Sequence, residues 1–314
     1  MKTPPRNRHL TTATTVHNTP LKRNSQHFSN AEPKTRETVD PTLYAEFSGA
    51  IFRDCQKFFD LYFNSPNTLE YAGKLYHTLE HSITSSKPSL KYASPILGFP
   101  EPAVEKNVIN WFLEKMNEIS KLVATEETPS KFHSSRNRIV PGGQCNRKPD
   151  IMLINSVKID PLKEYNESPY RWWMFHVVGE LKENPDYDER KGFVQLVGYV
   201  REIFGAQPGR RFVHGFSLYG DCMRCWVFDR VGAVGSEIFS INNSPELFCR
   251  TIAAYTTMNL EELGFDTTMK VLEYNTSKSF EDLEIFNPTN EAHRMRKHIT
   301  LLVERPGVQG IRMI

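Results

Sequence analysis

The sequence predicts an α/β (α+β) domain in which helices flank a mixed β-sheet. Helical and extended patterns alternate along the chain: a helical stripe at residues 102–122, apolar runs at 149–154 and 172–178, a helical pattern at 188–204, and strand patterns from 212 to 241. Hydrophobic residues form 39% of the 314 positions, enough for a sizeable core. We expect one domain over residues 41–285, with extra β-hairpins at 212–241.

Residues 1–40 have the composition of a disordered basic tail. They hold seven Lys or Arg against three Asp or Glu, with four Pro and scarcely any apolar side chains. Such a segment buries too little apolar surface to offset its chain entropy. Its excess of +4, subtracted from the formal net charge of +2, leaves the rest of the chain at −2, so bulk charge does not select a class of partner.

Two helices are expected before the strands. From Leu43 to Tyr62, apolar residues recur at three- and four-residue steps behind an Asp40–Pro41 start, which predicts an amphipathic helix. The helix at 102–122 has an apolar stripe, and Glu105 lies on that stripe one turn before Ile109. A carboxylate on a core-facing stripe is an anomaly that a site would explain.

The later elements place polar side chains in a regular way. Pro149–Asp150 opens one predicted strand, and Glu180–Leu181–Lys182 ends the next. On the helix at 188–204, three polar residues share a face apart from the apolar one: Gln195, Tyr199 and Glu202. We expect Gln195 and Tyr199 to lie on the exposed edge of this helix. Strands then follow at 212–219, 223–229 and 237–241, with turns at 220–221 and 232–235.

Several protein classes fit the sequence poorly. No apolar run is long enough for a membrane span, and the N-terminus lacks the apolar segment of a secretory signal. The five cysteines are irregularly spaced, unlike a disulfide framework. We therefore expect an intracellular protein, cytoplasmic or nuclear, with no membrane association.

Asp150, Glu180 and Lys182 form a candidate catalytic group. Residues two apart on a strand point the same way, so Glu180 and Lys182 share a face. If the two strands are neighbours, Asp150 approaches Glu180, and two close carboxylates repel unless a divalent cation such as Mg²⁺ lies between them. Phosphodiester cleavage needs such a metal and a nearby cation, which Lys182 supplies. The alternative is that Asp150 caps a strand and Glu180 and Lys182 form a solvated pair.

This order of Pro-Asp, Glu-x-Lys and a helix with Gln-x-x-x-Tyr resembles the PD-(D/E)XK nuclease superfamily over residues 100–220. The resemblance implies a nuclease-like core, with Gln195 and Tyr199 joining the catalytic group. It also implies a further metal ligand from the preceding helix, for which Glu105 is the first candidate and Glu101 the second.

A second resemblance covers residues 145–270. The segments that carry it are 179–182 (GELK), 195–204 (QLVGYVREIF), 207–216 (QPGRRFVHGF), 223–230 (MRCWVFDR), 235–236 (GS) and 263–266 (LGFD). They resemble the N-terminal region of the fungal-type protein kinases, in which a kinase domain follows. That implies that residues 286–314 are a linker and the truncated start of a missing kinase domain, and that the partner in longer relatives is that kinase domain.

The motifs of phosphoryl transfer by a protein kinase are absent from the sequence. No Asp-Phe-Gly occurs, His293–Arg294–Met295 lacks the catalytic Asp, and Gly232–Ser236 has two glycines and reads as a hairpin. We therefore expect no kinase activity from this chain.

Four other features have structural explanations that we favour over functional ones. The pair Cys222 and Cys225 has zinc-like spacing without a second pair. Arg210–Arg211 is a phosphate-binding candidate, Trp172–Trp173 a base-stacking candidate, and His176 an accessory to Glu180.

Two functions remain from the sequence. The first, which we favour for this chain, is a nuclease-like module that binds or regulates, with a protein or a nucleic acid as partner. The second is a Mg²⁺-dependent nuclease acting through Asp150, Glu180 and Lys182.

Overall fold

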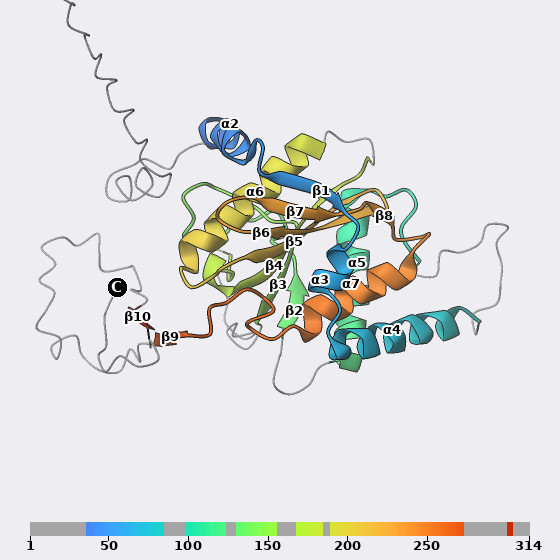
Figure 1. Cartoon of the computed structure of the whole chain (residues 1–314). Helices are drawn as coiled ribbons and strands as arrows, with labels where there is room; N and C mark the ends of the chain where they lie inside the picture. Colours follow the sequence, from blue (N-terminus) through green and yellow to red (C-terminus); the bar gives the residue numbers. More distant parts are fainter. Residues whose placement is uncertain are drawn as a thin grey trace, which may run out of the picture.

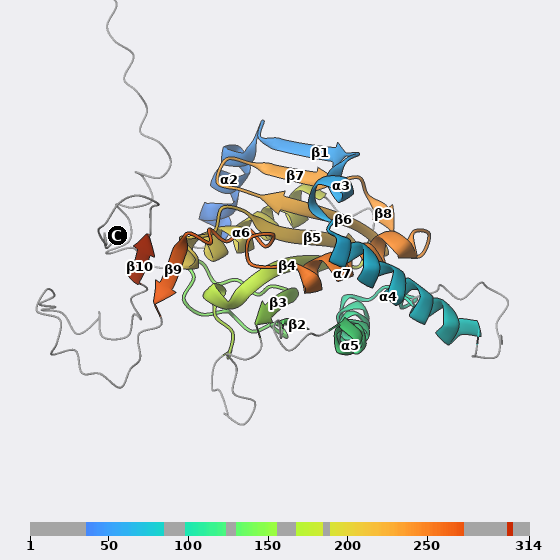
Figure 2. The same ribbon diagram turned by 60° about the horizontal axis from the view of Figure 1, so that its bottom comes forward.

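The centre of the protein is an eight-stranded mixed sheet (Figures 1 and 2). The structure is a computed structural model that describes residues 36–84, 98–123, 130–155, 168–184, 189–272 and 300–303. The sheet order is β1-β7-β6-β5-β4-β3-β2, and β8 pairs with β6. The strands of this sheet are β1 (Ile51–Cys55), β2 (Ser130–His133), β3 (Ile151–Asn155), β4 (Phe175–Lys182), β5 (Val213–Tyr219), β6 (Cys222–Phe228), β7 (Ala233–Ser236) and β8 (Phe239–Ser240).

In the middle of the sheet, one pair of neighbouring strands is parallel and the others are antiparallel. Strands β2, β3 and β4 form an antiparallel run, whereas β4 and β5 are parallel. Parallel neighbours need a long crossover, and α6 (Glu189–Ala206) provides it. Strand β6 then returns antiparallel to β5 through the turn at Gly220, whose φ is +56°.

Helices cover both faces of this sheet. One face carries α6 and α2 (Arg36–Phe47); the other carries α3 (Phe58–Tyr62), α4 (Pro66–Thr84), α5 (Glu105–Val123) and α7 (Pro245–Thr257), which lie in front of the sheet in Figure 2. Strand alternation divides β3 between the two cores. Ile151 and Leu153 pack on the α5 side, and Met152 and Ile154 pack on the α6 side.

The predicted fold class is confirmed, since helices flank a mixed sheet. The helices expected at 102–122 and 188–204 are α5 and α6, and the strands expected near 149–154 and 212–219 are β3 and β5. Residues Trp172–Met174, expected to begin a strand, form the short 3₁₀-helix η2 before β4.

The single helix predicted from Leu43 to Tyr62 is wrong. Helix α2 ends at Phe47, Gly49 has a φ of +88°, and residues Ile51–Cys55 form β1, which pairs in parallel with β7. Pairing with a strand almost two hundred residues away overrides the local helical spacing. Helix α4 was not anticipated from the sequence.

The predicted turn at 232–235 is also wrong. The turn between β6 and β7 spans residues 229–232, where Asp229 Oδ1 accepts the N–H groups of Val231 and Gly232, each at 2.7 Å. Residues Ala233–Ser236 form β7, because their backbone pairs with β6. The last predicted strand, 237–241, is reduced to β8 at Phe239–Ser240.

The boundary of the tail at residue 40 needs correction as well. Helix α2 starts at Arg36, because Val39 is buried on the sheet and Asp40 pairs with the buried Arg147. Residues 1–35 lie outside the described residues. So do 273–299 and 304–314, which contain most of the predicted linker. Its residues Thr300–Val303 form β10, antiparallel to β9 (Met269–Leu272). Within the described part of the chain, no helix has the length and apolar character required to cross a bilayer.

Candidate active site

The two motif strands are neighbours. Strands β3 and β4 pair antiparallel, with Ile151 opposite Gly179. This register places Asp150, the residue before β3, beside the end of β4, and its Oδ2 accepts the N–H of Leu181 at 2.9 Å. The structure therefore brings Asp150 to the strand end that carries Glu180 and Lys182.

Glu180 is the centre of the polar cluster, and its side chain is 1% exposed. Its Oε2 accepts a hydrogen bond from the Tyr199 hydroxyl at 2.7 Å. Its Oε1 contacts the ammonium of Lys182, which also donates to the carbonyl of Leu181 at 2.9 Å. The Lys182 side chain is 18% exposed, so the cluster is less enclosed at this residue.

Helix α6 supplies the remaining partners of Glu180. Leu196, Val197 and Val200 bury the apolar face of α6 on the sheet, which leaves Gln195 and Tyr199 beside β4. With its amide oriented to satisfy both groups, Gln195 donates to Glu180 Oε1 at 2.6 Å and accepts from Arg36 Nη2 at 2.7 Å. The expectation that Tyr199 lies on an exposed helix edge is wrong; Tyr199 is buried because it extends under the helix to Glu180.

Glu105 begins α5 at the same end of the sheet. The Glu105 backbone N–H donates to Glu183 Oε1 at 3.1 Å, which links α5 to the residue after β4. Burial raises the pKa of Glu105, Lys182 lowers it, and Glu180 and Glu183 raise it further. The carboxylate on the apolar stripe of α5 thus belongs electrostatically to the cluster. Glu101, the second candidate, is exposed and precedes the helix.

The charges of the cluster do not balance. Burial, and then the neighbouring Glu180, raise the pKa of Asp150 from 3.8 to about 8. Burial acts to lower the pKa of Lys182, but Glu180 and the other carboxylates outweigh this effect and raise that pKa. Lys182 therefore stays protonated. Burial and Glu180 also raise the pKa of Tyr199 well above its ordinary value, so the hydroxyl remains a donor. Asp150 is therefore protonated at neutral pH unless another positive charge joins it.

The donor atoms of this cluster suit a hard divalent cation. Carboxylate oxygens with room for water are the ligands that Mg²⁺ takes. In the part of the chain that the structure describes, no three His, Cys, Asp or Glu side chains are gathered closely enough to enclose an ion. Asp150 and Glu180 are the residues that would hold such an ion, which would supply the positive charge that the two carboxylates lack.

Several contacts that support the site were missed from the sequence. Arg147 is fully buried beside Gly198 of α6, and its Nη2 lies 2.5 Å from Asp40 Oδ1 of α2. Glu202, also on α6, accepts the backbone N–H of Gln144 at 2.6 Å and so fixes the loop that leads to Asp150. The shared face of Gln195, Tyr199 and Glu202 was visible in the sequence. The partners of that face were not, because they come from distant segments.

The other candidate residues have structural roles. Arg210 is completely buried and offers no surface for phosphates, whereas Arg211 is exposed and lies 3.7 Å from Glu261 Oε1. Cys225 is buried, and burial raises its pKa to about 12, which leaves Cys222 without a thiolate neighbour. His176 lies at the opposite end of β4 from the cluster, with its Nδ1 3.2 Å from Ser130 Oγ.

The two tryptophans divide between core and surface. Trp172 is buried and its Nε1 donates to the carbonyl of Val140 at 3.2 Å. Trp173 is 39% exposed. The preference for core packing over base stacking therefore holds for Trp172.

The family model described as "Fungal protein kinase" matches residues 148–308, just over half of the chain. The chain belongs to the fungal protein kinase family. The matched segment begins two residues before Asp150 and includes Glu180, Lys182, Gln195 and Tyr199, but neither Glu105 nor helix α2. No curated protein matches the chain.

Proposed function

We propose that this member of the fungal protein kinase family carries a divalent-cation-dependent site that hydrolyses phosphodiester bonds. The observation that supports the proposal is the convergence of Asp150, Glu180 and Lys182 from adjacent strands, with one carboxylate whose pKa is raised to about 8. Buried carboxylates that repel each other are costly, and they recur where a protein holds a metal ion. The chain order around them, from α5 through β4 and α6 to β5, agrees with the nuclease resemblance.

Each residue has a role that its surroundings suggest. Asp150 and Glu180 would hold Mg²⁺ or Mn²⁺, and Glu105 would be a further carboxylate ligand. When bound, such an ion neutralises charge on the scissile phosphate and lowers the pKa of the attacking water. The reaction adds one water across a P–O ester bond and leaves a phosphomonoester and an alcohol.

Lys182 provides the positive charge beside this reaction. Its raised pKa keeps it protonated, so it stabilises negative charge that develops on the phosphate oxygens or orients the water. Gln195 and Tyr199 donate to Glu180 and hold its oxygens in place. They are positioning residues for the carboxylate.

Calorimetry with Mg²⁺ and Mn²⁺, followed by a plasmid-nicking assay, tests the proposal. Lys182→Ala should retain metal binding and reduce nicking by about 10²- to 10³-fold, the typical loss of one charge-stabilising group. Asp150→Asn should lose the metal, since an amide supplies no charge. Gln195→Ala should weaken activity without unfolding α6, because Gln195 lies off the apolar face.

Lys131→Ala is the matched control. Lys131 is an exposed lysine on β2 of the same sheet, so its removal should not change nicking. No heat of metal binding at millimolar Mg²⁺, or nicking that survives in Lys182→Ala, would refute the hydrolytic site.

A binding or regulatory module is the second candidate. One observation favours it: both Glu180 oxygens already have partners, namely Lys182, Gln195 and Tyr199, so the cluster is stable without an ion. In that case the nuclease-like core would bind a nucleic acid or a protein, or a kinase domain in longer relatives. This candidate would be favoured if the wild-type protein does not bind metal and does not cleave DNA.

A further inference from the structure

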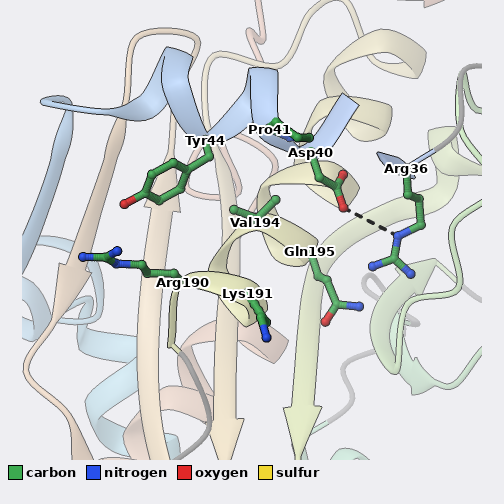
Figure 3. Close-up of a pocket in the computed structure, with 8 residues that line it drawn as sticks. All are labelled: Arg36, Asp40, Pro41, Tyr44, Arg190, Lys191, Val194 and Gln195. Carbon is green, nitrogen blue, oxygen red and sulfur yellow. Dashed lines mark ion pairs between the residues drawn. The ribbon is translucent and has the colours of Figure 1, made fainter. Parts of the chain in front are cut away.

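A groove of about 450 Å³ lies between α2 and α6 (Figure 3). Its lining includes Arg36 and Tyr44 from α2 and Arg190, Lys191, Val194 and Gln195 from α6. In Figure 3, Tyr44 and Arg36 lie at opposite ends of the groove, and Val194 lies between them.

The groove is joined directly to the candidate active site. Gln195 lines the groove and belongs to the Glu180 cluster, since its amide bridges Arg36 Nη2 at 2.7 Å and Glu180 Oε1 at 2.6 Å. If a nucleic-acid strand places one phosphate beside Lys182, its adjoining nucleotide therefore lies at the groove. Helix α2, which forms the other wall, lies outside the matched family segment.

The lining combines positive charge with an apolar surface. Arg36, Arg190 and Lys191 are cations, and the one carboxylate, Asp40, is paired with the buried Arg147 at 2.5 Å and with Arg36 at 3.7 Å (Figure 3). Arg190 and Lys191 also lie in the first turn of α6, where the helix dipole favours anions. Pro41, Tyr44 and Val194 contribute apolar surface to the lining of the groove. Anionic groups linked to flat aromatic rings match both features.

The charge of the chain argues against the groove being covered by the protein's own N-terminal segment. The 35 residues before Arg36 hold six Lys or Arg and one acidic residue, so they share the sign of the groove. A polyanion has the opposite sign and is attracted to the cations of the groove. A duplex presents its phosphates but hides its base faces, so it would leave the Tyr44 surface unused.

We propose that the α2–α6 groove binds an unpaired nucleotide of a single-stranded nucleic acid, next to the phosphate held at Asp150, Glu180 and Lys182. The base stacks on Tyr44, and a phosphate contacts Lys191 and Arg36. This inference rests on the proposed function, whose substrate class it narrows to single-stranded or unpaired regions.

The test is fluorescence anisotropy with a labelled single-stranded DNA of about 12 nucleotides, in EDTA so that no cleavage occurs. Tyr44→Ala should weaken binding about tenfold without changing its salt dependence, because stacking is not ionic. Lys191→Ala should reduce the slope of log affinity against log salt by about 0.7, the value for one phosphate contact on a single strand.

Two matched controls accompany these variants. Tyr44→Phe keeps the ring and should bind as the wild type does. Lys57→Ala removes an exposed lysine beside α3, on the other face of the sheet, and should leave the slope unchanged. Circular dichroism of each variant checks that α2 remains folded.

The outcomes separate the groove from the catalytic proposal. Equal binding of duplex and single strand, or wild-type affinity and salt slope in both Tyr44→Ala and Lys191→Ala, would overturn the groove, even if Lys182-dependent nicking is found. If the wild type with Mg²⁺ cleaves neither the plasmid nor the single strand, while single-strand binding responds to Tyr44 and Lys191, the hydrolytic function is overturned and the groove is supported.

Discussion

Arg210 and the pair of Asp150 and Glu180 are two buried charged groups beside the central sheet, and their surroundings differ. Arg210 is completely buried, and its guanidinium donates to the carbonyl of His176 at 2.7 Å, the carbonyl of Phe212 at 3.1 Å and Gln207 Oε1 at 3.2 Å. It also lies over the ring of Phe265, 4.1 Å from the ring centroid. Burial lowers the pKa of Arg210 only to about 9, so it stays charged at neutral pH.

The Asp150 and Glu180 pair lacks this balance. Glu180 has three donors, but Asp150 has one backbone donor and faces a second carboxylate. The comparison shows that burial of charge does not by itself mark a site. A buried charge whose partners are all present stabilises the fold, whereas a buried carboxylate that repels its neighbour is a candidate for a ligand site. Four predictions test this distinction, from the largest expected effect to the smallest.

Arg210→Met should remove the guanidinium whose hydrogen-bond partners are all present. The substitution leaves buried carbonyls and the Gln207 amide without a donor, so we expect a loss of about 3–5 kcal/mol in the free energy of unfolding. Denaturant titration measures it, with the exposed Arg211→Met as control at less than about 0.5 kcal/mol. A loss below about 1 kcal/mol for Arg210→Met would contradict the structural role.

Gly198→Ala and Gly205→Ala compare two glycines of α6. A Cβ at 198 would overlap the guanidinium of Arg147, whereas nothing lies within 4 Å of a Cβ at 205. We expect Gly198→Ala to cost about 2–3 kcal/mol and to loosen α2, because Arg147 would leave Asp40. Gly205→Ala should instead stabilise by up to about 1 kcal/mol through helix propensity. Equal thermal shifts for both variants would argue against the Arg147 contact.

Acid should destabilise the protein through two buried histidines. Burial lowers the pKa of His214, and of His133, from 6.5 to about 4. The unfolded chain therefore binds more protons between these values, so stability is complete above about pH 6.5 and is lost as the pH falls toward 4. We expect each histidine to contribute a loss of about 1–2 kcal/mol between pH 7 and pH 5, measured by denaturant titration.

The variant His214→Phe should reduce that pH dependence while lowering stability at pH 7. Its ring fits among Phe63, Phe212 and Tyr255, but the carbonyl of Glu262 loses its 3.0 Å partner. Replacing the exposed His77 should leave the pH dependence as it is. An unchanged slope in His214→Phe would show that His214 is not the group that titrates.

Asp150→Asn should stabilise the protein in EDTA. The pKa of Asp150 is raised to about 8 in the folded state, so the native Asp loses stability as the pH rises from about 4 through 8. The gain from Asn should grow over that range and reach about 2–5 °C in Tm above pH 8. Glu180→Gln should do the reverse, since Lys182 would lose its counter-charge. If Asp150→Asn lowers Tm at pH 8, the two carboxylates do not repel.

Strand and helix periodicity in the sequence determined much of the candidate site. The alternation of strand residues places Glu180 and Lys182 together, and the helical spacing places Gln195, Tyr199 and Glu202 on one face. The anomalous Glu105 on the α5 stripe was equally visible. These features depend on residues within one element, so local geometry alone specifies them.

Only the tertiary structure decided which elements meet. Pairing between β1 and β7 turned part of a predicted helix into a strand, and the register of β3 on β4 brought Asp150 to Leu181. The bridge from Arg36 through Gln195 to Glu180 joins residues 36, 195 and 180. Contacts of this kind depend on how distant segments pack and on which charges are buried together. Neither quantity is encoded in the spacing of residues along the chain.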